Sequence, residues 1–375
     1  NSRSVSETFS TGRKHWARRR FQSRIATTRE MNQIAIFCRK IPLLCACIFA
    51  LGFQDRMCGG SLDSIIDPID PNISKWASLV IAHSTEGQTE FDWHYYRNSR
   101  ETVDFWPAST IKIYTVVAAL EYLNELKRPL DSTLVFERQT DDRWHLDTAR
   151  TMREMISEVF RRSSNEDYSL LLRFVGIDRI NTQFLIPEKG FPHSALMRDY
   201  VTHRPIVYEN TEPQRIHIVT SHQESRTITH TWSGISFAEQ RGATILSSKT
   251  GNCTSTAELA ECMRRIMFHE SIPETERYQL TNAQVDAIRY GGGGLYGLEN
   301  KEAGPYAWES DLKKIFPKAR YFHKAGMISN YTLDVAYIAD ENSDTRFILS
   351  LAAKTGKDDT IRKMAGALAR WVHSQ

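Results

Sequence analysis

Ser109 and Lys112 are the first pair of residues whose types and spacing could support nucleophilic catalysis. They lie in Ser109-Thr110-Ile111-Lys112, shortly after Pro107 and at the start of an apolar stretch. On a helix, residues three apart share one face, so the lysine amine could take the proton of the serine hydroxyl. That step requires a lysine that is neutral part of the time, which burial or a nearby positive charge achieves by lowering its pKa.

The alternative is a surface lysine beside a helix-capping serine, because Ser-x-x-Lys is common by chance. The residues that follow argue against full exposure, since Ile113, Val116, Val117 and Ala118 are all apolar. A charge so close to a buried helix has a desolvation cost that calls for an explanation. The pair alone leaves the two interpretations balanced, and other motifs must decide between them.

Two further motifs follow along the chain. Ser163–Asn165 (SSN) precedes a leucine run, and Lys324–Met327 (KAGM) opens a strand-rich block. Together with Ser109-x-x-Lys112 they resemble the three signatures of penicillin-recognising serine enzymes, which are Ser-x-x-Lys, Ser-Asp-Asn and Lys-Thr-Gly. The class A β-lactamase-like family matches best, and the resemblance covers Trp76–Trp371 because the order of predicted elements agrees as well.

Three Lys-x-Gly sequences compete for the third motif. Lys249-Thr-Gly251 precedes a turn and a helix, and Lys354-Thr-Gly356 is followed only by a helix. Lys324-Ala-Gly326 leads into two more strands and a terminal helix, as the family's arrangement requires. We therefore assign the motif to Lys324, although the other two carry the commoner threonine.

The resemblance implies four catalytic residues. Ser109 would be the nucleophile that forms an acyl-enzyme, and Lys112 would accept its proton. Ser163 would relay a proton to the leaving nitrogen, and Lys324 would attract the substrate carboxylate and bias the local protonation states.

The resemblance also implies a substrate-binding set. Asn165 would hold the side-chain amide of the substrate, and Ala325, Gly326 and Met327 would line the site beside Lys324. The backbone N–H groups of Ser109 and Met327 would form an oxyanion hole, in which one donor contributes roughly 3–4 kcal/mol.

The chain departs from the family pattern at three points. Ser164 replaces the usual aspartate, and Ala325 replaces a threonine or serine that usually bonds the substrate carboxylate. No Glu-x-x-Leu-Asn sequence, which in class A enzymes supplies the base for deacylation, occurs in Gly190–Lys249. Glu209, Glu212, Glu224 and Glu239 lie in this stretch, but none has that context. An enzyme without this base could acylate and still hydrolyse slowly.

The elements that must position these residues indicate an α+β fold. We expect strands from both ends of the chain to form one antiparallel sheet flanked by helices. A second part should be all helical, with the active site between the sheet and this part. We predict strands over 76–83, 91–97, 320–324, 331–339 and 346–353. We predict helices over 107–126, 148–161, 167–174, 177–184, 256–268, 282–289 and 358–371. Residues 191–248 are expected to form a long loop with a hairpin at 216–220 and 227–231.

The N-terminal region has the pattern of an export signal. Residues 1–30 are strongly basic, and 31–52 combine Arg39-Lys40 with a 13-residue apolar run that ends near Ala50-Leu51-Gly52. A short buried helix is the alternative. If translation starts at Met31, residues 1–30 are an untranslated leader. We expect 31–52 to be a signal peptide, 53–75 a linker and 76–375 the hydrolase domain, exported to the periplasm or outside the cell. Cys47 gives only weak support for a lipid anchor.

Charge and composition limit the partners. The chain of 375 residues has a net charge of +3, but residues 1–52 contribute +8 and the remainder −5. The expected mature protein is therefore mildly acidic, which argues against a nucleic-acid partner. No apolar stretch approaches the roughly 20 residues of a membrane span. The histidines lack zinc-site spacing, so we expect no metal and no cofactor. Nothing in the spacing of Cys253 and Cys262 indicates whether they pair.

These observations predict a monomeric serine hydrolase that acts through an acyl-Ser109 intermediate. β-Lactamase-type hydrolysis of β-lactam amides is the first interpretation. A penicillin-binding D,D-peptidase acting on a peptidoglycan-derived peptide, or a sensor that stays acylated, is the alternative.

Overall fold

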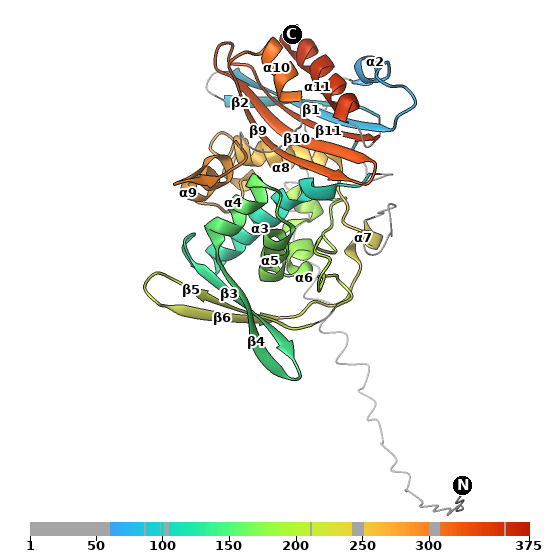
Figure 1. Ribbon diagram of the computed structural model, residues 1–375. Helices are drawn as coiled ribbons and strands as arrows, with labels where there is room; N and C mark the ends of the chain where they lie inside the picture. Colours follow the sequence, from blue (N-terminus) through green and yellow to red (C-terminus); the bar gives the residue numbers. More distant parts are fainter. Residues whose placement is uncertain are drawn as a thin grey trace, which may run out of the picture. The chain divides into compact units, whose positions relative to one another are not determined.

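Both ends of the chain build one five-stranded antiparallel sheet in the computed structural model, as the sequence predicts (Figure 1). The structure describes residues 61–85, 88–97, 99–100, 105–210, 212–241, 251–299, 308–355 and 358–375, all within one compact unit. The predicted leader (1–30), the predicted signal peptide (31–52) and Lys249 lie outside the described residues.

The strand order of this sheet is β2-β1-β11-β10-β9, which makes β9 an edge strand. The strands are β1 (Lys75–Thr85), β2 (Gln88–Tyr95), β9 (Ala319–Ile328), β10 (Tyr331–Asp340) and β11 (Arg346–Lys354). β9 continues four residues beyond its predicted end at Lys324. The whole Lys324–Met327 motif therefore lies in regular strand geometry, with Leu333 opposite Gly326.

Helices cover both faces of the sheet. On one face, α11 (Asp358–His373) packs with α10 (Trp308–Ile315) and the short α2 (Asp63–Ile66). The apolar stripe predicted for the terminal helix is buried there through Ile361, Met364, Ala365 and Leu368. On the other face, α8 (Thr256–Met267) lies against β1, β10 and β11 (Figure 1).

The segment 61–75, which falls in the predicted linker, is part of the folded unit. Leu62 and Ile66 are buried in the core between the sheet and α11. Tyr96 Oη donates a hydrogen bond to Asp67 Oδ1 at 2.8 Å, which ties α2 to the end of β2.

A buried helix, α3 (Lys112–Glu125), forms the centre of the helical part. Its residues from Lys112 to Leu120 are all buried, as expected for a helix that is apolar on every side. A 3₁₀ turn, Ala108–Ile111, precedes it, so the predicted 107–126 helix is divided at Lys112. The neighbouring helices are α4 (Met152–Arg161), α5 (Asn165–Val175), α6 (Ile177–Arg179), the π-helical turn Ile180–Phe184, α7 (Phe237–Gln240) and α9 (Asn282–Tyr290).

The part expected to be all helical also contains a four-stranded antiparallel sheet, of order β4-β3-β5-β6. Its strands are β3 (Thr133–Thr140), β4 (Arg143–Thr151), β5 (Gln214–Val219) and β6 (Ser225–His230). The hairpin of β5 and β6 is confirmed, whereas the hairpin of β3 and β4 was not predicted. Leu134, Phe136, Ile216 and Ile218 bury one face of this sheet against the helices.

The predicted helix 148–161 begins too early. Thr151 caps α4 in a capping box, in which its hydroxyl accepts from Glu154 N and the Glu154 carboxylate accepts from Thr151 N. The preceding residues belong to β4.

Within the described residues, no helix has the length and apolar character needed to cross a bilayer.

Candidate active site

Ser109 lies in the 3₁₀ turn that leads into α3 and is partly exposed. The residue before it, Ala108, has a φ of +46°, a left-handed conformation that is costly for a residue with a Cβ and is often retained at functional sites. Thr110 Oγ1 donates to Pro107 O at 2.5 Å and closes the turn. Among the described residues, none hydrogen-bonds the Ser109 hydroxyl, which leaves it available to a substrate.

Lys112 is fully buried one turn further on, which excludes the interpretation of a surface lysine. Its Nζ contacts Ser163 O at 2.5 Å, Asn165 Oδ1 at 2.6 Å and Ser163 Oγ at 3.3 Å. Burial lowers the pKa of Lys112 to about 6, and the positive charge of Lys324 adds to this effect, while Glu166 and Asp167 oppose it.

A neutral Lys112 suits these contacts. A neutral amine has two hydrogens, which Ser163 O and Asn165 Oδ1 can accept, and one lone pair that remains free for a proton. No hydrogen bond joins Lys112 Nζ to Ser109 Oγ among the described residues. The two are placed on one helical turn, and proton transfer requires this contact to form in the substrate complex.

Ser163 connects the two lysines. Its hydroxyl lies 2.9 Å from Lys324 Nζ and 3.3 Å from Lys112 Nζ. It stands between α4 and α5 with a φ of +57°, so its backbone leaves the path of both helices. The next residue, Ser164, caps α5 by accepting from Asp167 N at 3.1 Å, and Asn165 is the first residue of that helix.

Lys324 lies on β9 and is almost completely buried. Besides its bond to Ser163, its Nζ donates to Ala325 O at 2.7 Å. Burial lowers the pKa of Lys324 to about 8, and the nearby Asp334 carboxylate partly opposes this shift. Ala325 has no hydroxyl, so this position offers a substrate carboxylate no side-chain donor.

Gly326 allows β9 to approach the turn of Ser109. A Cβ at Gly326 would lie 2.9 Å from Ser109 N, closer than real Cβ atoms come, and 3.0 Å from Thr110 N, which is also unusually tight. Glycine is needed here for close approach rather than for an unusual φ angle. The nucleophile and the strand motif are therefore neighbours.

The backbone N–H of Met327 points to the outer edge of β9, away from β10. His323 N donates to Leu298 O at 3.0 Å on the outer, unpaired side of this edge strand. Because N–H directions alternate along an antiparallel strand, the N–H groups of Ala325 and Met327 point to that side as well. Met327 is 57% exposed. This arrangement fits the oxyanion donors implied for Ser109 and Met327.

The structure thus gathers Ser109, Lys112, Ser163 and Lys324 at one place, with Asn165, Ala325, Gly326 and Met327 around them. Of the competing motifs, Lys354 lies at the end of β11 with its Nζ 5.4 Å from the Tyr331 ring centroid. It makes no hydrogen bond to the gathered residues.

Two tyrosines beside Lys112 were not predicted. The ring centroids of Tyr168 and Tyr200 lie 5.7 and 5.9 Å from Lys112 Nζ. Tyr200 Oη donates to Ala108 O at 2.9 Å and so holds the strained residue before the nucleophile. Tyr200 belongs to the 191–248 stretch, where no sequence motif marks it.

A buried acid behind Lys324 was also missed. Asp334 Oδ2 lies 2.9 Å from His323 Nδ1 and accepts from Tyr321 Oη at 3.0 Å. These side chains occupy the sheet face opposite Lys324 and Gly326, because neighbouring residues of a strand alternate in direction.

No carboxylate among the described residues hydrogen-bonds Ser109, Lys112 or Ser163. Two of the glutamates considered from the sequence have other partners: Glu212 pairs with Arg138 and Arg204, and Glu224 with Arg128.

Cys253 and Cys262 are free, buried thiols, and burial raises the pKa of each to about 12. The residues that the structure describes contain no cluster of three His, Cys, Asp or Glu side chains that could hold a metal ion.

The sequence of residues 85–375 matches the profile of the Beta-lactamase enzyme family. The chain belongs to this family. Its family and fold are those of serine hydrolases, which confirms the predicted enzyme class. No curated protein sequence matches the chain.

Solved structures show that this family member has the β-lactamase/transpeptidase-like fold. A β-lactamase from Xanthomonas campestris has 14% identity and a TM-score of 0.52, over 82% of this chain and 96% of that one. A β-lactamase from Sphaerobacter thermophilus has 15% identity and a TM-score of 0.51, over 84% and 97%. PBP-A has 16% identity and a TM-score of 0.50, over 84% and 98%. The predicted fold class is confirmed.

Proposed function

We propose that this member of the Beta-lactamase enzyme family hydrolyses β-lactam amides through an ester on Ser109. The observation that carries the proposal is the hydroxyl of Ser163, which contacts both Lys112 and Lys324 beside the turn of Ser109. One lysine with a pKa of about 6 and another with a pKa of about 8 supply a neutral base and a cation at neutral pH.

Acylation begins when Lys112 takes the proton of Ser109 and Ser109 Oγ attacks the carbonyl carbon. The backbone N–H groups of Ser109 and Met327 stabilise the oxyanion. The C–N bond then breaks, and the proton on Lys112 passes through Ser163 to the leaving nitrogen. Lys324 binds the substrate carboxylate, and Asn165 orients its side-chain amide.

Deacylation adds water to the Ser109 ester, which releases the ring-opened acid and restores the serine hydroxyl. Since no described carboxylate hydrogen-bonds Lys112, we propose that this step uses Lys112 as its base. The same observation favours a second candidate function, a D,D-peptidase or sensor that accepts peptidoglycan-derived peptides and retains β-lactams as adducts. A variant of PBP-A has been solved as an acyl-enzyme complex with penicillin G.

One experiment separates the two functions. The full chain is mixed with a chromogenic cephalosporin, and the colour change and the intact protein mass are followed together. Many turnovers per protein with little adduct support the β-lactamase. A single burst followed by a stable adduct supports the peptidase or sensor. Neither colour nor adduct would contradict both, provided that circular dichroism shows the protein to be folded.

The same proposal includes export and a monomeric state. The basic residues and apolar run of 31–52 support cleavage of a signal peptide, and the substrates named above occur outside the cytoplasm. N-terminal sequencing of the protein from the periplasmic or culture fraction tests this. A mature N-terminus near residue 53 is expected, and an intact residue 31–52 segment on that protein would contradict it.

A further inference from the structure

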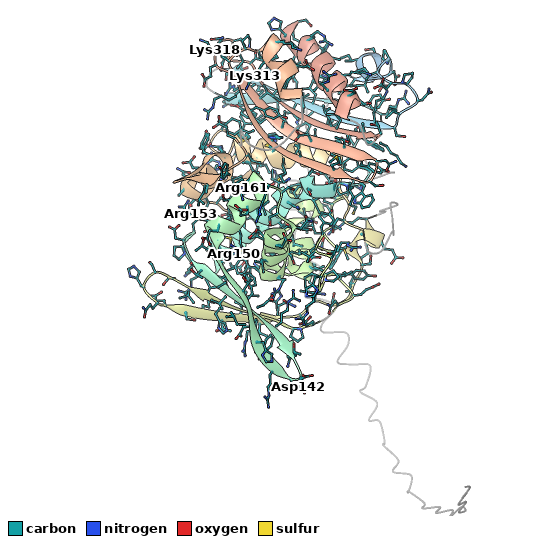
Figure 2. The ribbon with its side chains drawn as sticks, viewed as in Figure 1. Asp142, Arg150, Arg153, Arg161, Lys313 and Lys318 are labelled. Atoms are coloured by element: carbon teal, nitrogen blue, oxygen red, sulfur yellow. The ribbon has the colours of Figure 1, made fainter. Side chains whose placement is uncertain are left out.

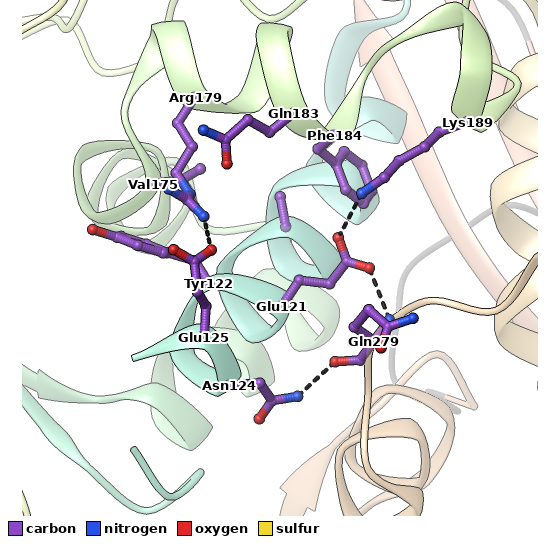
Figure 3. Close-up of a pocket in the computed structure, with 11 residues that line it drawn as sticks. Glu121, Tyr122, Asn124, Glu125, Val175, Arg179, Gln183, Phe184, Lys189 and Gln279 are labelled. Atoms are coloured by element: carbon purple, nitrogen blue, oxygen red, sulfur yellow. Dashed lines mark hydrogen bonds and ion pairs between the residues drawn. The ribbon is translucent and has the colours of Figure 1, made fainter. Parts of the chain in front are cut away.

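A cavity of about 440 Å³ lies between the second half of α3, the π-helical turn Ile180–Phe184 and the segment at Gln279 (Figure 3). Its lining on α3 runs from Ala118 to Glu125 and includes none of the residues assigned to the active site. At 1.5 Å per residue, the lining residues Ala118 and Glu125 are about 9 and 20 Å along the helix from Lys112. The cavity is therefore separate from the Ser109 site, and its volume suits a small organic molecule.

Opposite charges face each other across this cavity. Glu121 and Glu125 project from α3 one turn apart, and Lys189 and Arg179 project from the opposite wall (Figure 3). Lys189 Nζ lies 3.5 Å from Glu121 Oε2, and Arg179 forms an ion pair with Glu125. Lys189 and Arg179 are partly exposed, and ion pairs of this kind contribute little stability, so a ligand can replace them at small cost.

Aromatic rings supply the apolar part of the wall. The Arg179 guanidinium lies 4.0 Å from the Tyr122 ring centroid, which fixes both groups by a cation–π contact. Phe184 is held by stacking on Phe191 and Tyr278, with ring centroids 5.8 and 5.6 Å apart. Tyr122 is half-buried and Phe184 is 3% exposed, so an apolar side chain of a ligand would contact mainly the Tyr122 ring beside Arg179.

Two exposed glutamines complete the wall of the cavity. Among the described residues, none hydrogen-bonds the side-chain amide of Gln183, which lines the cavity. Gln183 and Phe184 stand on the π-helical turn, a rare conformation that is frequent at functional sites. Opposite them, Gln279 is fixed through its backbone, since its N–H donates to Glu121 Oε1 at 2.8 Å and its O accepts from Asn124 Nδ2 at 2.6 Å.

We propose that this cavity is a second binding site, and that its ligand is a zwitterionic short peptide with an apolar side chain. The peptide ammonium would replace the cations at Glu121 and Glu125, and its carboxylate would replace the anions at Lys189 and Arg179. A ligand of a single charge would leave one pair of like charges uncompensated, so the cavity selects molecules that carry both. The peptide amide would bond Gln183, and the side chain would pack on Tyr122 and Phe184.

Binding of phenylalanyl-alanine to the full-length Ser109→Ala chain tests the proposal, with isothermal calorimetry as the readout. A molecule of this size is expected to bind with a Kd of about 0.1–1 mM. N-acetylation of the dipeptide and amidation of its carboxylate should each weaken binding about 10-fold or more, because each removes a charge-assisted contact. This ligand series uses one unchanged protein, so it does not depend on how variants fold.

Variants then locate the site. Glu121→Gln should weaken binding of the free dipeptide about 10-fold but leave binding of its N-acetyl form unchanged. Lys189→Gln should weaken binding of the free dipeptide by a similar factor but leave binding of its C-terminal amide unchanged. Glu224→Gln, which removes an exposed ion pair outside the cavity, is the matched control and should change nothing. Equal binding of all three peptides, unchanged binding by Glu121→Gln and Lys189→Gln, or no saturable binding would overturn the proposal. Because Ser109 is absent from this assay, its outcome is independent of the proposed hydrolase activity.

Discussion

Lys324 Nζ donates a hydrogen bond to Ser163 Oγ at 2.9 Å, which joins the third motif of the chain to the second. Lys112 Nζ lies 3.3 Å from the same oxygen, so one hydroxyl links two buried amines. The two positive charges cannot both be solvated here, and the pKa of each amine is lowered. Arg150, Lys313 and Lys318, which are labelled in Figure 2, are exposed, whereas Lys112 and Lys324 are buried.

The first prediction concerns pH. Acylation should become faster as the pH rises through about 6, where Lys112 loses its proton, and slower above about 8, where Lys324 becomes neutral. Lys324→Arg should keep the acidic limb and remove the alkaline limb, because arginine stays charged. Stopped-flow acylation rates from pH 5 to about 9.5 measure both limbs. An alkaline limb that persists in Lys324→Arg would contradict the assignment.

Two adjacent serines should have different functions. Ser163→Ala should slow acylation by about 100-fold or more, because it removes the hydroxyl between the lysines, with little effect on stability. Ser164→Ala removes the cap of α5 and should lower the free energy of unfolding by about 1 kcal/mol. Acylation rates and urea unfolding of both variants test this contrast. If Ser164→Ala slowed acylation as much as Ser163→Ala, the role of Ser163 would be in doubt.

Gly326→Ala should prevent acylation without unfolding the protein. The new Cβ would meet Ser109 N and Thr110 N, so β9 and the nucleophile turn must separate, at a cost of about 1–3 kcal/mol. Gly366→Ala in α11 is the matched control, since its Cβ would meet only the Arg370 side chain at 3.5 Å or more. That control should raise stability by about 0.5–1 kcal/mol and leave acylation unchanged. Normal acylation by Gly326→Ala would refute the close approach.

Asp334 should set the upper end of the active pH range. Its carboxylate raises the pKa of Lys324, so Asp334→Asn should lower that pKa and move the alkaline limb to lower pH. The amide oxygen can still accept from Tyr321, which preserves the packing. Asp340→Asn, on the same strand but bonded to Ser343, should leave the limb in place. A limb that stays unchanged in Asp334→Asn would show that this charge does not act on Lys324.

The sequence was sufficient for features that depend on local spacing. Ser109 and Lys112 stand three apart where the apolar helix begins, and the strands after Lys324 distinguish it from Lys354. The order of strands and helices then identified the α+β class and the sheet built from both chain ends.

Features without local periodicity were missed. β4 is largely exposed, so its residues show no apolar alternation, and only the Thr151–Glu154 capping box marks where α4 begins. Tyr200 reaches Ala108 across 92 positions of the chain, a contact that tertiary structure alone determines. The Asp334 and His323 pair likewise arises from strand register.

The most direct test of the account is the site of acylation. The full chain and its Ser109→Ala variant are incubated with penicillin G near pH 7, quenched in acid, and compared by intact mass and peptide mapping. We predict one penicilloyl group per chain, located on Ser109 and absent from the variant, whether the adduct is transient or stable. An adduct on another residue, or equal labelling of Ser109→Ala, would contradict the account.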